Sequence, residues 1–258
     1  MAHRILVLSP LHNMGATVAS CMIAQGATYS GYSSTLLFTE PRSPIPDYLG
    51  VDTIVDPTRN ITQVVELINA GSMPNAEIVN YAHAYEKNAY LMNTADPSLT
   101  DRAKLQTVTY IYERVQTDIV VCDCSDDLGE TITSDLLEMS HMIFIVIDLS
   151  PKSVRYFKHW MSQKQFKGMS NVFVILSKYD ESIVALRDFA KTISMPANRV
   201  CKVHYNPWIR KCCFSGTMAT ILPLAQTLDY RVAALKNDIT EFNQAIEGDL
   251  LLSSRQGL

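Results

Sequence analysis

Short apolar runs recur along this chain of 258 residues, and they restrict its fold more than any other feature. Five of them are nearly continuous in Val, Ile, Leu and Phe, and a sixth at 200–205 is weaker. The five lie at 4–9, 35–39, 118–123, 142–148 and 172–177. Uninterrupted apolar runs of this length are typical of strands buried on both faces. They predict the inner strands of a sheet that is covered on each side.

The stretches between these runs have helical spacing of their apolar residues. They lie at 15–25, 60–69, 99–115, 130–139, 153–166 and 183–193. Strands that alternate with helices imply right-handed crossovers and a parallel sheet. The sequence therefore predicts an α/β fold with three layers, in which a doubly wound, mainly parallel sheet is flanked by helices.

Two parts of the chain fit this alternation less well. Residues 73–94 show little periodicity and predict an irregular surface excursion that ends in a short strand near 89–92. Residues 219–245 predict a helix in two pieces that meet near Pro223, and residues 249–258 are expected to fray. Because we find no repeat, low-complexity tract or linker, we expect one domain over residues 1–258.

Composition excludes several classes of protein. Apolar residues make up 47% of the chain, enough for a large core, and the net charge of −4 gives no overall attraction to nucleic acid or acidic lipid. No apolar run approaches the roughly 18 residues of a membrane span, and the N-terminus lacks the features of a signal peptide. Six cysteines without a C-x-x-C pair indicate reduced thiols. We expect a cytoplasmic protein.

The first predicted strand is followed by a loop and by a helix that opens at Gly15. Backbone N–H groups in such a loop, together with the helix dipole, attract an anion. The phosphate-loop pattern G-x-x-x-x-G-K-[ST] adds a lysine for the phosphates and a hydroxyl for magnesium. Gly15 and Thr17 occupy the expected positions here, but Ala16 stands at the lysine position.

This loop and four later segments resemble the ParA/MinD family of P-loop proteins, which writes the loop as K-G-G-x-G-K-[ST]. In that pattern the first lysine reaches the nucleotide of the other subunit in a dimer. Leu11 replaces this lysine, and His12 and Asn13 replace the two early glycines. The resemblance, which runs from about residue 4 to about residue 235, implies the fold, a homodimer and Mg-ATP as the cofactor. The missing lysines lead us to expect no cofactor.

The later segments correspond to family motifs at strand ends. Glu40-Pro41-Arg42 resembles the switch segment that begins with Asp-Pro, and Asp123 keeps the acid that lies near the magnesium water. In Ser177-Lys178-Tyr179-Asp180 a serine stands where the family has the asparagine that reads adenine. Asn206-Pro207 resembles the segment that borders the base.

These correspondences imply a set of site residues for any nucleotide that binds. Its contacts would come from Asn13, Met14, Gly15, Ala16, Thr17, Val18, Ser177, Lys178 and Pro207, its magnesium ligands would be Thr17 and Asp123, and the catalytic acids would be Glu40 and Asp123. Plainer roles stay open for several of them. His12 either binds an anion when it is protonated or is a solvated loop residue. The alternative role of Thr17 is a local hydrogen bond within the first helical turn, and that of Asp123 is a solvent-exposed acid at a strand end.

The lost lysines are the groups that matter most for phosphate chemistry. A charge-assisted hydrogen bond contributes about 1.5–3 kcal/mol, so two missing lysines remove about 3–6 kcal/mol, or about two to four decades of affinity. The lost glycines matter too, because a tight anion cradle needs positive φ angles, which Asn13 tolerates better than His12 or Met14. We therefore expect a protein that is not an enzyme.

Two other segments carry basic and aromatic residues. The helix at 152–167 fits contact with DNA or an acidic partner, or a surface helix that packs its aromatic side on the sheet, and we favour the packing role. The segment 206–214, with Trp208, Arg210 and Lys211, is the better candidate for an interface. The histidines are too far apart to predict a metal hydrolase.

Three hypotheses follow. The first, which we favour, is a non-catalytic, dimeric interaction or positioning protein that resembles the accessory positioning factors of pilus-assembly and secretion machines (TadZ/CpaE-like). The second is a positioning or partitioning ATPase in which Lys178, Arg42 or a partner's lysine replaces the lost charge. The third, a nucleic-acid-binding protein using residues 152–167, is disfavoured by the net charge.

Overall fold

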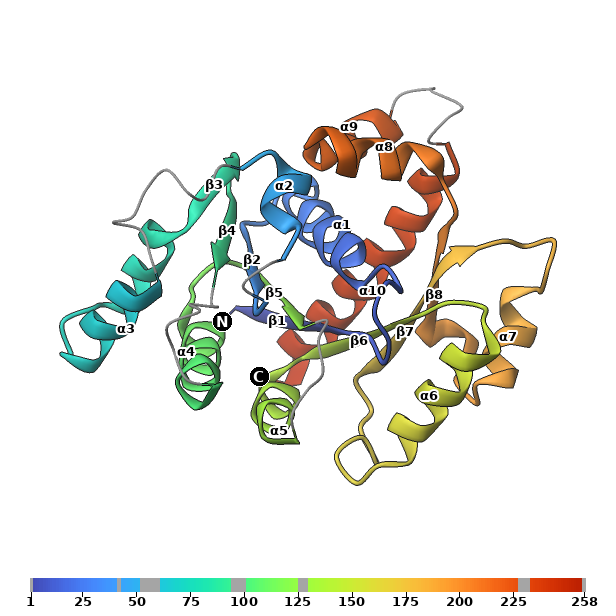
Figure 1. Cartoon of the computed structure of the whole chain (residues 1–258), viewed down its shortest axis with the longest axis horizontal. Coiled ribbons are helices and arrows are strands. Elements are labelled where there is room, and N and C mark those ends of the chain that lie inside the picture. Colours follow the sequence, from blue (N-terminus) through green and yellow to red (C-terminus); the bar gives the residue numbers. More distant parts are fainter. Residues whose placement is uncertain are drawn as a thin grey trace.

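The computed structural model describes residues 2–40, 43–51, 61–93, 101–124, 130–226 and 233–256. Its central feature is a sheet with the strand order β3-β4-β2-β5-β1-β6-β7-β8 (Figure 1). The strands are β1 (His3–Leu8), β2 (Ser34–Phe38), β3 (His83–Glu86), β4 (Ala89–Asn93), β5 (Ile119–Cys124), β6 (Met142–Ile147), β7 (Val172–Tyr179) and β8 (Val200–His204). β3 pairs antiparallel with β4, and the other described pairs are parallel.

Helices cover both faces of this sheet (Figure 1). One layer contains α1 (Ala16–Tyr29), α2 (Ile45–Leu49), α8 (Pro207–Ser215), η3 (Met218–Thr220), α9 (Ile221–Gln226) and α10 (Ala233–Gln256). The other contains α3 (Ile61–Asn69), η1 (Asn75–Tyr81), α4 (Asp101–Arg114), α5 (Glu130–Met139), α6 (Pro151–Ser162) and α7 (Leu186–Thr192); η2 (Ala197–Arg199) leads into β8. The predicted three-layer α/β fold is confirmed.

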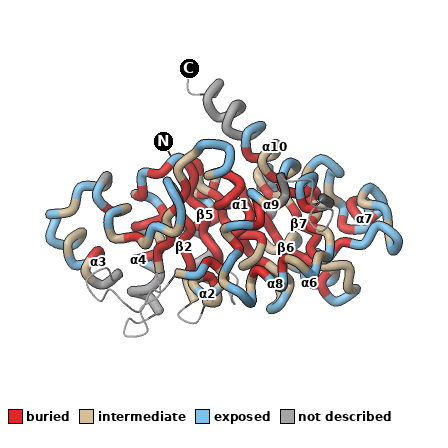
Figure 2. Tube along the Cα trace, turned by 90° about the horizontal axis from the view of Figure 1, so that it is seen from above, coloured by how far each residue is buried: buried red, intermediate tan, exposed pale blue. Residues whose placement is uncertain are grey.

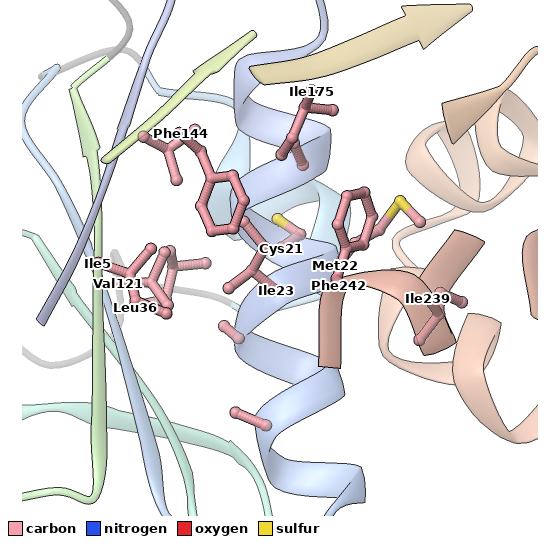
Figure 3. Packing of buried hydrophobic residues seen from close by; sticks show 14 of the residues in the cluster. Ile5, Cys21, Met22, Ile23, Leu36, Val121, Phe144, Ile175, Ile239 and Phe242 are labelled. Atoms are coloured by element: carbon pink, nitrogen blue, oxygen red, sulfur yellow. The ribbon is translucent and has the colours of Figure 1, made fainter. Parts of the chain in front are cut away.

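Successive side chains of a strand point to opposite faces of the sheet, and this alternation explains why the molecule has two hydrophobic cores. On β1, Ile5 and Val7 belong to the core under α1, whereas Leu6 and Leu8 belong to the core on the opposite face. α1 itself is buried on nearly all sides, because α10 packs over it and Phe242 of α10 reaches in beside Met22 and Phe144 (Figure 3). The buried residues therefore concentrate in the middle of the molecule (Figure 2).

The apolar runs locate the strands well. Each of the six predicted strands, and the short strand near 89–92, matches an observed strand to within two residues at either end. The excursion before the short strand is more regular than expected. It contains the helical turn η1 and the edge strand β3, whose residues alternate between half-buried and exposed. The expectation of an irregular segment was therefore wrong at β3.

The C-terminal helices also depart from expectation. Pro223 lies inside α9, at its third residue, and the piece before α9 is the helical turn η3, which ends at Thr220. A proline in the first turn of a helix is tolerated because its missing N–H would have no partner there. α10 is helical to Gln256, seven residues beyond the position from which fraying was predicted. Residues 60, 94, 99, 100, 227–232, 257 and 258 of the predicted elements lie outside the described part of the chain.

Candidate functional site

The β1–α1 loop has the backbone shape of an anion cradle. Asn13 and Gly15 have left-handed backbone conformations, with φ angles of 63° and 90°. Gly15 is the N-cap of α1 and has no side chain with which to cap the first helical turn. The N–H groups at the start of α1 are therefore left to bind something other than a cap. The expectation that Asn13, not His12 or Met14, takes the positive φ angle is confirmed.

An open pocket of about 390 Å³ lies over this loop. Its described lining residues are Ser9, Leu11, His12, Asn13, Met14, Gly15, Ala16, Thr17, Val18, Glu40, Pro44 and Tyr48. None of these lining residues is Lys or Arg. Burial raises the pKa of the Tyr48 phenol, with a smaller contribution from nearby Cys213, so this side chain adds no charge. Within the described residues, the pocket has the shape of an anion site and a lining that includes no permanent cation.

The two candidate magnesium ligands have different surroundings. Thr17 lines the pocket and is half-buried. Asp123, at the end of β5, is 3% exposed and accepts a 3.0 Å hydrogen bond from the Ser20 hydroxyl, one turn further along α1. The alternative of a solvent-exposed acid at this strand end was wrong, because α1 covers it. Asp123 is not among the described residues that line the pocket.

Ser177 and Lys178 reach the loop from β7 and contact its carbonyl groups. The Ser177 hydroxyl donates to Met14 O at 2.5 Å, and Lys178 Nζ donates to Asn13 O at 2.9 Å. Lys178 has a φ angle of 52° and is exposed. Neither residue is among the described lining residues of the pocket. Both side chains therefore hydrogen-bond to the loop from β7 without lining the described part of the pocket.

The remaining predicted residues are those of the switch segment and of the segment at Asn206-Pro207. Glu40 lines the pocket, whereas Pro41 and Arg42 lie outside the described residues. Pro207 begins α8, where the Asn206 side chain accepts a 2.8 Å hydrogen bond from Trp208 N. α8 exposes 94% of Phe214, and Lys211 Nζ lies 4.2 Å from the centre of the Trp208 ring.

α2 forms a wall of the pocket that the motif comparison missed. Pro44 and Tyr48 line the pocket, and α2 packs against α8. The junction is a contact of two glycines that cap these helices, Gly50 and Gly216, with φ angles of 67° and 65°. A Cβ atom added to Gly50 would lie 2.6 Å from Gly216 O. The sequence signal was present, since Ser43-Pro44-Ile45-Pro46 before a glycine is typical of a short capped helix.

The six cysteines are free, and five of them are buried, as the sequence indicated. Within the described ranges, no group of three or more His, Cys, Asp or Glu side chains could hold a metal ion. No helix among the described residues is both long and apolar enough to cross a membrane.

No protein-family model and no curated protein sequence matches this chain, but solved structures match it in shape. A ParA family ATPase from Chlorobium tepidum TLS has a TM-score of 0.70 at 15% identity, covering 94% of this chain and 99% of that one. The septum site-determining protein MinD complexed with Mg-ADP, from Pyrococcus horikoshii OT3, has a TM-score of 0.67 at 13% identity, with 95% and 96% covered.

The chain has the ParA/MinD fold. The MinC:MinD cell division protein complex of Aquifex aeolicus matches in the same way, with a TM-score of 0.71 at 14% identity and 96% of both chains covered. Each of these matches covers nearly the whole length of both chains. At such identities the likeness concerns the fold, and the chemistry of the pocket has to be argued from its own residues.

Proposed function

We propose that this chain is a non-catalytic interaction or positioning protein that uses the ParA/MinD fold as a homodimeric scaffold. The observation that supports this proposal most directly is the pocket over Gly15, because none of its described lining residues is Lys or Arg. The backbone of the loop fits a phosphate group, but the side chains do not supply the charge that a triphosphate with magnesium needs.

Energetics favour this proposal over catalysis. Phosphoryl transfer depends almost entirely on positioning and on stabilising charge in the transition state. Leu11 and Ala16 stand where lysines would act, and the acid at Asp123 is bonded to Ser20 beneath α1. The residues therefore do not fit Mg-ATP as a cofactor, and we derive no reaction step from it.

The same substitutions support a dimer held by apolar contacts. Leu11 and Met14 are half-buried and line the open side of the loop, the side on which a second copy would sit face to face. Burying apolar side chains there would replace a nucleotide as the bridge between subunits. By analogy with TadZ/CpaE-like factors, we propose a role in positioning part of a pilus or secretion machine.

One observation favours a second candidate, a nucleotide-dependent ATPase with an altered loop. Lys178 Nζ lies 2.9 Å from Asn13 O, so a rotation of its exposed side chain would move a cation from this loop carbonyl toward the pocket. In this alternative Lys178 replaces the charge that Ala16 lacks.

Calorimetry separates the two candidates. Titration of the full chain with millimolar Mg-ATP or Mg-ADP is expected to give no saturable heat, and sedimentation is expected to show a dimer that nucleotide does not change. Saturable binding that Lys178→Met abolishes would establish the second candidate instead. Lys191→Met, at an exposed lysine on α7, is the matched control.

A further inference from the structure

Positive charge is concentrated in one stretch of this acidic chain. Residues 149–179 contain six Lys and Arg and no Asp or Glu. The remaining chain has 16 Lys and Arg against 26 Asp and Glu, so its formal net charge is −10. A cationic stretch of this length on an acidic protein is a local feature of the surface that total charge conceals.

α6 presents this charge on one side. Ser153 and Phe157 are fully buried against the sheet, whereas Lys152, Arg155 and Lys158 are exposed. Residues three apart lie on neighbouring positions of a helix surface, so these three form a row along the outer face. The amphipathic pattern that predicted packing of the aromatic side is thus confirmed at Phe157, and the other side remains open to solvent.

The turn after α6 continues the row. The rings of Trp160 and Phe166 stack with their centres 5.8 Å apart and an interplanar angle of 11°, and Phe166 is 1% exposed. Gln163 N donates to Trp160 O, which folds the turn back onto the end of the helix. Lys164 and Lys167 are exposed on this turn. The turn holds both of them near the end of α6. We call Lys152, Arg155, Lys158, Lys164 and Lys167 the basic row.

We propose that the basic row is a docking surface for a short acidic segment of another protein. α6 has 12 residues and is therefore about 18 Å long. An acidic helix of about the same number of residues in the partner would match it in length. Tyr156, 41% exposed beside Lys152, adds an aromatic contact of the kind that anchors protein interfaces. Arg155 adds a planar donor for carboxylates.

Charge outside the row argues against a long polyanion. Nucleic acid or an anionic membrane extends beyond α6 and would meet the acidic remainder of the chain. A short acidic segment interacts only with the local row, because charges are screened beyond about 8 Å at physiological ionic strength. The inner side of α6 contacts the loop, where the Ser153 hydroxyl lies 3.6 Å from Met14 Sδ. A partner on α6 would thus lie one helix away from the pocket.

A labelled peptide tests this proposal. The probe is a fluorescent peptide of about 12 residues, rich in Glu with one central Phe, titrated with the full chain at about 0.15 M salt. Saturable binding is expected, with little binding of a duplex DNA of about 20 base pairs or of vesicles with about 30% phosphatidylglycerol. Lys158→Glu with Lys164→Glu is expected to weaken peptide binding at least about tenfold.

The control pair is Lys87→Glu with Lys236→Glu, which makes the same change in charge at exposed lysines away from α6. It is expected to leave peptide affinity within about twofold, because the effect is local. An equal loss in the control pair, no binding of the peptide, or tighter binding of DNA or vesicles would overturn the proposal. The Gln versions of the first pair, which keep helix propensity, give a second measurement if the Glu versions do not fold. Binding of both peptide and Mg-ATP would contradict the proposed function and leave this inference intact.

Discussion

The β1–α1 and β6–α6 connections share a layout but differ in how the helix begins. Ser150 caps α6 by accepting a 3.2 Å hydrogen bond from Ser153 N, and Asp148 accepts bonds from the N–H and hydroxyl of Ser150. Gly15 caps α1 with no side chain at all. The first turn of α6 is thus satisfied by its own side chains, whereas that of α1 opens into the pocket.

This difference shows which part of a phosphate site the chain retains. The backbone part, with left-handed Asn13 and Gly15 and an uncapped helix, is present. The cationic part, which Leu11 and Ala16 would carry, is absent. Because backbone and side chains contribute separately to anion binding, the two parts can be altered one at a time.

Introducing lysines at positions 11 and 16 should change the difference between the two helix starts the most. In the variant Leu11→Lys with Ala16→Lys, two charge-assisted contacts are expected to add about 3–6 kcal/mol to phosphate binding, or about two to four decades of affinity. Calorimetry with Mg-ATP measures the gain. The same two lysines placed at Ile183 and Phe214, both exposed, are the control. A folded variant that still ignores Mg-ATP would show that the loop backbone is not shaped for phosphate.

Replacing the N-cap glycine should have the next largest effect. Gly15→Ala is expected to lower the free energy of unfolding by about 1–2 kcal/mol, since φ is 90° there. A steric clash does not cause this loss of stability, because the added Cβ would lie 3.6 Å from the Ser177 Cβ. Gly248→Ala in α10, with ordinary φ and open surroundings, is expected to stabilise by about 0.5–1 kcal/mol. Denaturant unfolding measures both, and equal effects would remove the argument from backbone strain.

Removing the cap of α6 should have the smallest effect. Ser150→Ala is expected to cost about 1 kcal/mol of unfolding free energy, because Ser153 N loses its acceptor. Ser170→Ala, at an exposed serine beyond the basic row, serves as the control and is expected to change stability by less than about 0.5 kcal/mol. If thermal melts of the two variants coincide, then α6 does not depend on its cap and the contrast with α1 loses its meaning.

The sequence predicted the inner strands and the loop well, because both depend on local features. Continuous apolar runs mark strands buried on two faces, and Gly15 marks a helix start after a strand. β3 was missed because an edge strand with one open face needs no apolar run. The start of α9 at Ile221 was placed near Pro223, since the sequence does not say which residue of the first helical turn is the proline.

Contacts between distant segments were beyond sequence reasoning. Asp123 is buried because α1 crosses over the end of β5, and Ser20 reaches it from a residue 103 positions away. Lys178 bonds to the Asn13 carbonyl 165 positions away and has a φ angle of 52°, and neither the contact nor the angle is visible in a motif. Of the residues that the motifs indicated, 13–18 and Glu40 line the pocket, whereas Asp123, Ser177 and Lys178 are not among its described lining residues.

The contact of Gly50 with Gly216 joins two positions that are far apart in the sequence. A Cβ on Gly216 would approach within 3.0 Å of Asp47 O, so neither residue can change without moving α2 away from α8. In relatives of this chain that keep the same junction, glycine should be inherited at both positions together. A pair of glycines at these two positions would identify such relatives where overall identity is too low to do so.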